Sequence, residues 1–366
     1  MNKKLLAVAL ATAFAAPAMA EGVQIYGAFD VGVLVRGGNE GATTDARDTR
    51  TNVSSGMNGH NFIGFKMSED LGNGMTLGGD AQFGFNLDSG DVNTTAGGSA
   101  GSNLRTITST LALSGDFGTV VAGRTGGARA AWIKKYDPFG GFGVAGALGT
   151  HGGGGEDYAN NVVAWVTPEL GIPGLKGLAA YTTSLDSQDR NSTKNTLGAL
   201  YAFALMYDNG PLSFVLNTER LWTSGLKAAG VESIQVYTVG ASYDLGAVKV
   251  YGLYDMLTNV TTGWQVGAAA PVSSALTLKA GYIKSKGHGL NGNGTDCDKA
   301  GAGLTYALSK RTNFYADVAT LTSSDRATCA INTYGGQHGA MVGSDAQGVS
   351  NGYGATGFDA GIRHTF

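Results

Sequence analysis

The chain has 366 residues, with 25 Lys and Arg against 28 Asp and Glu, so its formal net charge is −3 at pH 7. This balance argues against a nucleic-acid partner, which would require a concentrated positive surface. The 60 Gly and only 6 Pro favour an all-β chain, because Gly costs stability inside helices and is tolerated in turns and tightly curved sheets.

The chain opens with a predicted export signal. Two lysines at positions 3 and 4 precede an apolar stretch at 5–16 and the cleavage pattern Ala18-Met19-Ala20. We expect residues 1–20 to be removed, leaving one mature domain, 21–366. No later stretch reaches the ~18 apolar residues that a spanning helix needs, so the chain is predicted to be secreted, periplasmic or an outer-membrane barrel.

Alternating residues mark the first predicted strand, "VQIYGAFDVGVLVR". Apolar side chains recur on one parity from Val23 to Val35, and the other parity carries Asp30 and Arg36. This period of two predicts one apolar face and one wet face. The run is longer than a usual strand of ~5–6 residues and suits a tilted strand crossing a bilayer. The same alternation recurs around Asp80.

Short turns alternate with long polar spans along the rest of the chain. Seven segments rich in Gly, Asn, Asp or Pro predict tight turns: Asp70 to Gly74, Gly115 to Gly118, Pro168 to Gly177, Asp208 to Leu212, Asp244 to Ala247, Pro271 to Ala275 and Ser309 to Asn313. Longer loops are predicted between them, at 37–60, 88–103, 126–157, 186–194, 223–232, 258–262, 287–298 and 323–355.

Seven turns join fourteen strands, and a first and a last strand flank them. The expected fold is therefore all-β, a 16-stranded antiparallel transmembrane β-barrel, because short turns at one end and long loops at the other are typical of such barrels. A soluble β-sandwich or a β-solenoid is the alternative, but neither accounts for the asymmetry of the connections.

Six segments, in order, resemble those of Gram-negative general porins of the neisserial and betaproteobacterial branch. The most specific are "GAGLTYALSKRTNFYADV" (301–318) and "GIRHTF" (361–366); the others are "VQIYGAFDVGV", "GFKMSEDLGNGM", "GDFGTVVAGR" and "NNVVAWVTPEL". The resemblance implies a water-filled, homotrimeric outer-membrane barrel for passive diffusion of ions and small hydrophilic solutes. It also implies that the third long loop folds inward to narrow the pore.

The third loop, Gly126 to Asp157, supplies the acidic candidates for the pore constriction. Asp137 begins "DPFGG", which resembles the PEFGG motif of enterobacterial porin constriction loops, and Glu156 and Asp157 close the loop as weaker candidates. The alternative for Asp137 is a turn-forming Asp before Pro.

The barrel wall supplies the basic candidates. Arg124 matches the G-R of the family and shares its parity with Val120 and Ala122, which we predict to face the lumen. Lys66 alternates with apolar neighbours and is also predicted to point inward. Further charges on the predicted lumen parity are Asp30, Arg36, Asp80, Asp359 and Arg363. A basic residue facing mid-bilayer lipid would cost ~2–4 kcal/mol. The alternative for each charge is a place in a wide, wet part of the lumen.

The sequence also contains a possible disulfide and a possible cation site. Cys297 and Cys329 are the only cysteines of an exported chain and predict a disulfide, with two unpaired thiols as the alternative. Asn291 to Asp298 clusters oxygen ligands for Ca²⁺ in an extracellular loop, but it lacks the spacing and terminal Glu of an EF-hand. We expect no metal site and no cofactor.

The remaining expectations concern partners and rival functions. The resemblance implies that Phe366 serves as a C-terminal signal for the barrel-assembly machinery, and outer-membrane lipid and lipopolysaccharide are the expected surroundings. An outer-membrane hydrolase would need a nucleophile with His and Asp near the rim, and no such cluster is visible in the sequence. The long span 323–355 is the only feature of the sequence that favours a surface adhesin or a structural barrel. Counting charges does not decide between anion and cation selectivity.

Overall fold

The computed structural model describes residues 22–37, 49–88, 105–148, 150, 158–182, 199–222, 230–288, 296–323 and 356–366. The predicted export signal, residues 1–20, lies outside this part of the chain. Glu156, Asp157 and Cys329 also lie outside it.

The described residues form strands and one short helix, in this order: β1 (Gly22–Gly37), β2 (Arg50–Ser55), β3 (Phe62–Gly72), β4 (Met75–Gly84), β5 (Arg105–Gly115), β6 (Gly118–Gly126), α1 (Ala128–Lys135), β7 (Tyr158–Val166), β8 (Leu175–Thr182), β9 (Ala199–Asn209), β10 (Leu212–Trp222), β11 (Ile234–Asp244), β12 (Lys249–Leu257), β13 (Thr261–Pro271), β14 (Leu276–Gly287), β15 (Asp296–Ala307), β16 (Thr312–Ser323) and β17 (Thr356–Thr365). Among these residues no helix has both the length and the apolar character needed to cross a bilayer.

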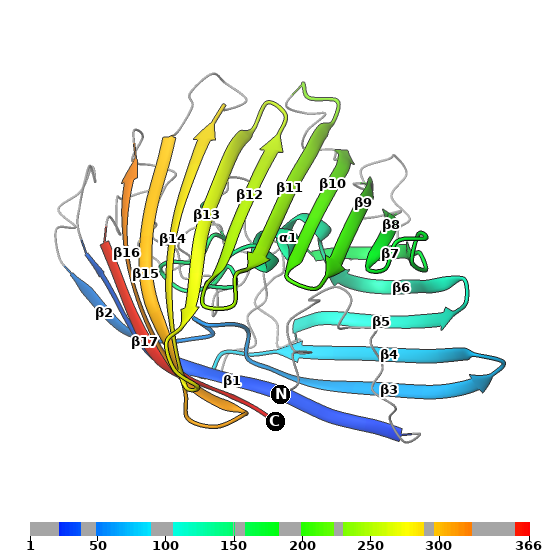
Figure 1. Cartoon of the computed structure of the whole chain (residues 1–366), viewed down its shortest axis with the longest axis horizontal. Helices are drawn as coiled ribbons and strands as arrows, with labels where there is room; N and C mark the ends of the chain where they lie inside the picture. Colours follow the sequence, from blue (N-terminus) through cyan, green and yellow to red (C-terminus); the bar gives the residue numbers. More distant parts are fainter. Residues whose placement is uncertain are drawn as a thin grey trace.

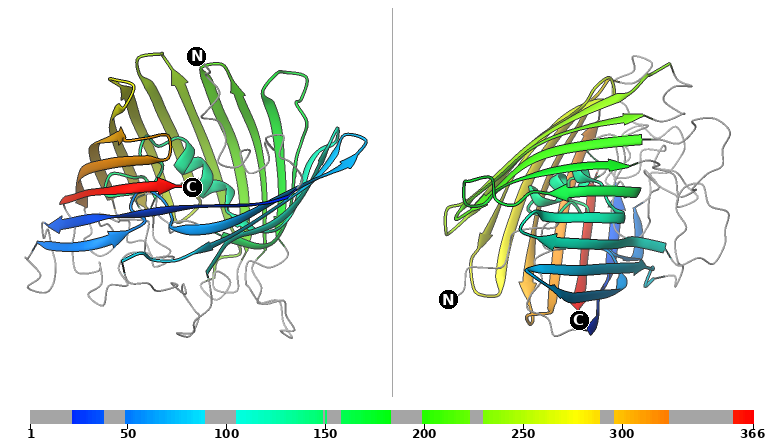
Figure 2. Two further views of the ribbon diagram at one scale, coloured as in Figure 1. Left: turned by 90° about the horizontal axis from the view of Figure 1, so that it is seen from below. Right: turned by 90° about the vertical axis from the view of Figure 1, so that its right-hand side faces the viewer.

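The strands close into one antiparallel barrel (Figures 1 and 2). From β3 to β17 each strand pairs with its neighbours in sequence. β17 then pairs with the second half of β1, and β3 pairs with the first half of β1, so the ring has no free edge. The predicted 16-stranded antiparallel barrel is confirmed, with β2 as one additional strand.

The additional strand corrects the prediction of an uninterrupted loop over 37–60. β2 pairs with β1 from Val31↔Ser55 to Arg36↔Arg50. Both β2 and β3 therefore lie beside β1 on the same edge, and residues 56–61 interrupt the wall between them. We call residues 56–61 the β2–β3 segment.

The predicted turns are confirmed, because each of the seven segments connects two consecutive strands. In the β3–β4 turn, Asn73 and Gly74 have φ of 53° and 75°, the left-handed conformation that a tight hairpin requires and that Asn-Gly tolerates. At the opposite end of the barrel, the predicted loop at 258–262 is only a short turn over 258–260.

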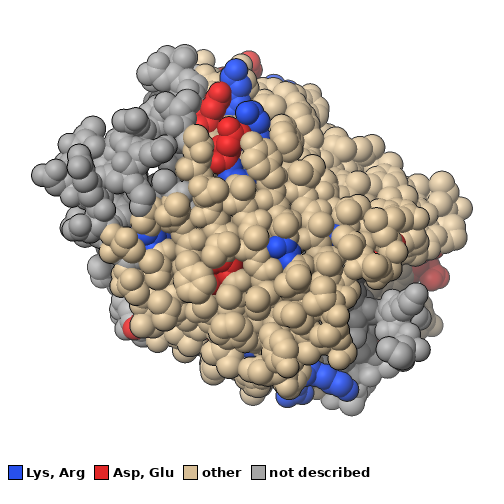
Figure 3. Space-filling model, turned by 60° about the vertical axis from the view of Figure 1, so that its left-hand side comes forward, with Lys and Arg blue, Asp and Glu red and all other residues tan. Residues whose placement is uncertain are grey.

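The two faces of the wall differ in polarity. On β1, Val23 and Ile25 point outward and are 68% and 61% exposed, whereas Asp30 on the other parity is fully buried inside. Uncharged residues cover most of the outer surface that Figure 3 shows. This distribution is the one that a bilayer outside and water or protein inside require.

Phe366 extends the β1–β17 ladder by one step. Its N–H and C=O groups exchange hydrogen bonds of 3.1 Å with Gly27. The Phe366 ring lies edge to face with Phe29, with 5.2 Å between centroids, and over Gly27, where a Cβ would come within 2.5 Å of it. A glycine is therefore needed at position 27 to seat this ring.

We predict that a charge on the outer face destabilises the barrel more than one on the inner face. Leu216, in the middle of β10, is 48% exposed on the outer face. Leu216→Arg should lower the free energy of unfolding by ~2–4 kcal/mol, measured by denaturant titration of the protein refolded into vesicles.

Thr110→Arg is the matched control. Thr110 pairs with the inward-facing Asp80 and points into the barrel, so the new guanidinium reaches water or the Asp80 carboxylate. Equal losses of stability for the two variants would contradict the assignment of the faces.

Candidate functional site

Helix α1, in the connection from β6 to β7, lies inside the barrel (Figure 1). We call residues 127–148 the inner segment. Lys134 and Lys135 occupy the last turn of α1, where positive charge is favourable to the helix dipole. Trp132 and Ile133 are 2% and 1% exposed. The prediction that the third loop folds inward therefore agrees with the position of its described part.

The inner segment covers an apolar part of the wall. Trp132 and Ile133 form a core with inward-facing residues of β8–β10, β12 and β14: Leu178, Ala204, Met206, Val215, Leu253 and Ile283. Ala164 and Val166 of β7 pack against the same core, which explains the apolar inward run of that strand. This side of the interior is thus filled with protein.

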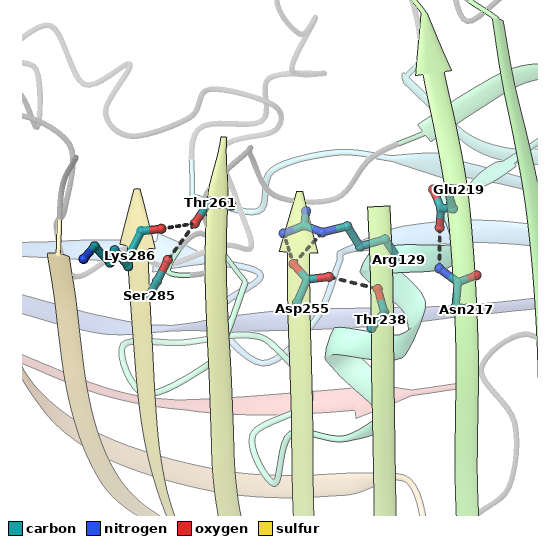
Figure 4. Close-up of polar contacts among 8 residues, drawn as sticks. All are labelled: Arg129, Asn217, Glu219, Thr238, Asp255, Thr261, Ser285 and Lys286. Carbon is teal, nitrogen blue, oxygen red and sulfur yellow. Dashed lines mark hydrogen bonds and ion pairs between the residues drawn. The ribbon is translucent and has the colours of Figure 1, made fainter. Parts of the chain in front are cut away.

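Polar contacts fix α1 against β9–β13. Arg129 forms an ion pair of 2.6 Å with Asp255, whose other oxygen accepts the Thr238 hydroxyl at 2.9 Å (Figure 4). Lys135 lies 2.8 Å from Asp208 on β9. Because the first pair is buried, removal of one partner would leave an uncompensated charge at a cost of ~3–5 kcal/mol.

Tyr136 follows α1 and completes its attachment. Its side chain is buried and its hydroxyl lies 3.0 Å from the Ser213 hydroxyl. Burial raises the pKa of this phenol, opposed by the Ser213 contact. Gln265 donates to the Tyr136 carbonyl at 2.9 Å.

Asp137 organises the turns that follow the helix. It is 7% exposed, and its carboxylate accepts the backbone N–H groups of Phe139, Gly141 and Ala147 at 3.1, 2.8 and 2.8 Å. Burial raises the pKa of this carboxyl, whereas the three amides and Lys299 oppose the rise. This position differs from the predicted acidic side of the constriction, because the carboxylate is directed into the loop.

The far end of the inner segment is attached to β14–β17. Val144 N–H donates to Asp359 at 2.7 Å, and the Lys299 ammonium donates to the Gly146 carbonyl. The Lys279 ammonium lies 3.6 Å from Asp317 and 4.8 Å from the centroid of the Phe139 ring.

Two buried carboxylates lie opposite each other at this attachment. Asp317 and Asp359 are direct partners in the β16–β17 ladder and are 2% and 0% exposed. Like charges in opposite positions destabilise a sheet, so the Lys279 ammonium and the Val144 N–H are needed to offset this pair.

Asp30 anchors the β2–β3 segment. Its carboxylate accepts the Asn58 N–H at 2.7 Å and the Tyr315 hydroxyl at 2.6 Å, and it lies 3.5 Å from the Arg363 guanidinium. Met57, 1% exposed, packs with Tyr315 and with residues of the inner segment. The predicted lumen residues Asp30, Asp359 and Arg363 thus all hold interior elements to the wall.

On β3 and β4, Lys66 and Asp80 are paired neighbours on the inward parity. The Lys66 ammonium lies 4.5 Å from the centroid of the Tyr26 ring. Asp80 accepts the Tyr26 hydroxyl and, at 3.0 Å, the Gln82 amide. Lys66 is half-buried and no loop contact holds it among the described residues. Arg36 lies near the C-terminal end of β1 and is 8% exposed.

Arg124 reaches the interior by a route that strand parity does not predict. Val120 is 38% exposed and pairs with Trp165, which is 44% exposed, so the predicted inward parity of Val120 and Ala122 is wrong. The β6–β7 register shifts between Gly123 and Thr125, and Gly123 has φ of 134°. This irregularity changes the direction of the Arg124 side chain relative to regular alternation. Arg124 donates to Asn160 and lies 4.9 Å from the centroid of the Tyr158 ring.

Cys297 lies in β15 and is disulfide-bonded; Cys329, its predicted partner, lies outside the described residues. Most of the oxygen-rich stretch 291–298 is also outside them, and Asp298 at its end lies 3.2 Å from Lys284. Among the residues that the structure describes, no group of three or more His, Cys, Asp or Glu is arranged to hold a metal ion.

Sequence reasoning missed two kinds of interior residue. Lys279, Lys299 and Asp317 lie on inward parities of predicted strands, so alternation could have found them. His60 and Tyr158 carried no sequence signal, because their contact depends on the interruption of the wall at the β2–β3 segment.

Comparisons with known proteins agree with this geometry. The family described as Gram-negative porin matches residues 7–326. Outer membrane porin protein 32 of Delftia acidovorans is 30% identical over 392 residues, covering 100% of both chains. An outer membrane porin protein of Bordetella pertussis is 32% identical over 315 residues, covering 80% of this chain and 77% of its own. The structure of an anion-selective porin from Comamonas acidovorans has a TM-score of 0.70 and 24% identity, covering 95% of this chain and 100% of that one.

We predict that Asp137 acts through the fold of the loop and not through its charge. Asp137→Ala would leave three backbone N–H groups without their acceptor, so the free energy of unfolding should fall by about 1–3 kcal/mol or more, and current through single channels should become noisier. Asp116→Ala, in the exposed β5–β6 turn, is the control and should change neither. A quiet, fully stable Asp137→Ala variant would contradict this role.

Proposed function

The chain belongs to the Gram-negative porin family, and we propose that its channel prefers anions over cations. As an outer-membrane porin it forms a water-filled channel for passive diffusion of ions and small hydrophilic solutes. Such a channel needs no covalent step and no cofactor, and we propose that this chain has neither. Selectivity then depends on the charges that line the narrowed interior.

The main support for anion preference is that the interior acidic side chains have local partners. The acidic side chains on the inner wall and the inner segment, as far as the structure describes them, are engaged by local partners. Asp30, Asp208, Asp255 and Asp317 lie in ion pairs. Backbone or side-chain donors hold the rest: Asp80, Asp137, Glu219 and Asp359.

Two basic residues point into the interior from the wall. Lys66 on β3 contacts the Tyr26 ring, and Arg124 on β6 donates to Asn160. A narrow passage with low-dielectric walls concentrates the field of such charges. We propose that Arg124 and Lys66 form the basic side of the constriction and that anions pass along it.

We propose that residues 1–20 are removed on export and that the barrel-assembly machinery reads Phe366. The protein then forms a homotrimer surrounded by outer-membrane lipid and lipopolysaccharide. The exposed apolar side chains Phe29, Val33, Phe358 and Ile362, on adjacent β1 and β17, suit contact with a neighbouring subunit.

We predict that Arg124→Gln shifts the reversal potential toward cations. Loss of a unit charge at ~4 Å from the ion path removes about 1 kcal/mol, or about fivefold in the chloride-to-potassium permeability ratio. The ratio is measured in planar bilayers under a KCl gradient, and Lys66→Gln should act in the same direction.

Arg311→Gln, in the exposed β15–β16 turn, is the control and should leave the ratio unchanged. An unchanged ratio in Arg124→Gln would place Arg124 away from the constriction. A protein that inserts without conducting would instead support a structural barrel or an adhesin.

We predict that the trimer interface includes β1. Val33→Arg, on β1, should weaken the trimer seen on gels without heating, whereas Val239→Arg, on β11, should not. The two side chains are 41% and 48% exposed on the outer face, so both variants bring a similar cost in lipid. Equal dissociation would argue against an interface at β1.

A further inference from the structure

The β2–β3 segment brings a histidine into the barrel interior. Gly56 N–H donates to the Asp30 carbonyl at 2.9 Å, and Asp30 N–H donates to the Asn61 side chain. At the other end, the Asn61 carbonyl accepts the Phe85 N–H at 3.2 Å. The segment is thus fixed at both ends, and the backbone of His60 between them has a defined position.

His60 lies where three interior elements meet. Its Nε2 is 3.2 Å from the Tyr158 hydroxyl at the start of β7, and its ring is edge to face with Phe142 of the inner segment, with 5.4 Å between centroids. β4, β5 and β6 separate β3 from β7 in the wall. The His60–Tyr158 contact therefore joins two distant parts of the wall beside the inner segment.

Among the residues that the structure describes, three basic groups lie near this imidazole. The Arg124 guanidinium stacks on the Tyr158 ring that His60 contacts, and the Lys134 ammonium lies 5.9 Å from the centroid of the Phe142 ring. Arg363 lies 3.4 Å from the His60 carbonyl and is itself paired with Asp30. A proton on His60 would add charge to the side of the interior that we assign to anion passage.

We propose that His60 is a selectivity-determining residue, whose protonated form increases the preference of the channel for anions. The inference rests on the proposed channel function and on the place of His60 beside Tyr158 and Arg124. An imidazole is the side chain that ordinarily changes charge between pH 5 and 8. The interior of an outer-membrane channel is open to the external medium, and the proposal requires that protons reach the His60 ring, whose Nδ1 is buried.

The sign of the effect follows from the charge. As the pH falls from 8 to 5, His60 gains a proton and the constriction becomes more positive. The chloride-to-potassium permeability ratio should then rise about two- to fivefold, as expected for one unit charge at ~4–8 Å from an ion in water. Asp30 is the carboxylate that holds the β2–β3 segment, and it lies 3.5 Å from the Arg363 guanidinium.

The test is the reversal potential of the full-length protein in planar bilayers under a KCl gradient, recorded at steps from pH 8 to pH 5. The wild-type ratio should rise, whereas His60→Gln, which keeps hydrogen-bonding groups but does not titrate, should show a clearly smaller rise. His60→Asn serves the same purpose if the Gln variant does not insert. A flat wild-type ratio, or an undiminished rise in the variant, overturns the proposal.

His364→Gln is the matched control. His364 lies on the exposed outer parity of β17, where its Nδ1 is 2.8 Å from the Thr312 hydroxyl, so this variant should keep the full response. Failure of the inference is distinguishable from failure of the proposed function. A conducting, anion-preferring channel with no pH response rejects only the role of His60, whereas a channel that prefers cations at every pH rejects the proposed function.

Discussion

A sheet in a bilayer must pair its backbone N–H and C=O groups within itself, because the hydrocarbon offers no partners. β1 is the strand on which this closure depends. One edge of β1 pairs with β17, and the other pairs first with β3 and then with β2. The change of partner leaves room for the β2–β3 segment to turn inward without opening the ring. The pairing of β1 with both β3 and β2 therefore closes the wall and also lets the β2–β3 segment enter the interior.

The interior charges fall into two groups by position. Asp30, Asp137 and Asp359 are buried and hold segments in place by accepting backbone hydrogen bonds. Lys66 and Arg124 lie on β3 and β6, which contribute no residue to the cores that the inner segment forms. A narrow channel benefits from this division, because anchors that also faced the ion path would tie selectivity to the stability of the loop.

The fold could be predicted from the sequence because its two determinants are local. Alternation sets which residues face lipid, and Gly-Asn-Asp turns set where strands end. The interior was less predictable because it depends on departures from these rules. The register shift between Gly123 and Thr125 breaks the alternation that wrongly placed Val120 and Ala122 inside. Asp137 carries a motif whose sequence is the same whether its carboxylate faces ions or folds the loop.

The opposed pair Asp317 and Asp359 links the inner segment to the closure of the barrel. Asp359 accepts a hydrogen bond from the Val144 N–H group, more than two hundred positions earlier in the chain. Asp359 lies between β16 and β1 only when the ring is closed. If the ring shut with the inner segment still outside, two carboxylates would face each other without that donor. The entry of the loop and the joining of β17 to β1 therefore stabilise each other, because the strand that closes the ring also carries the carboxylate that holds the loop.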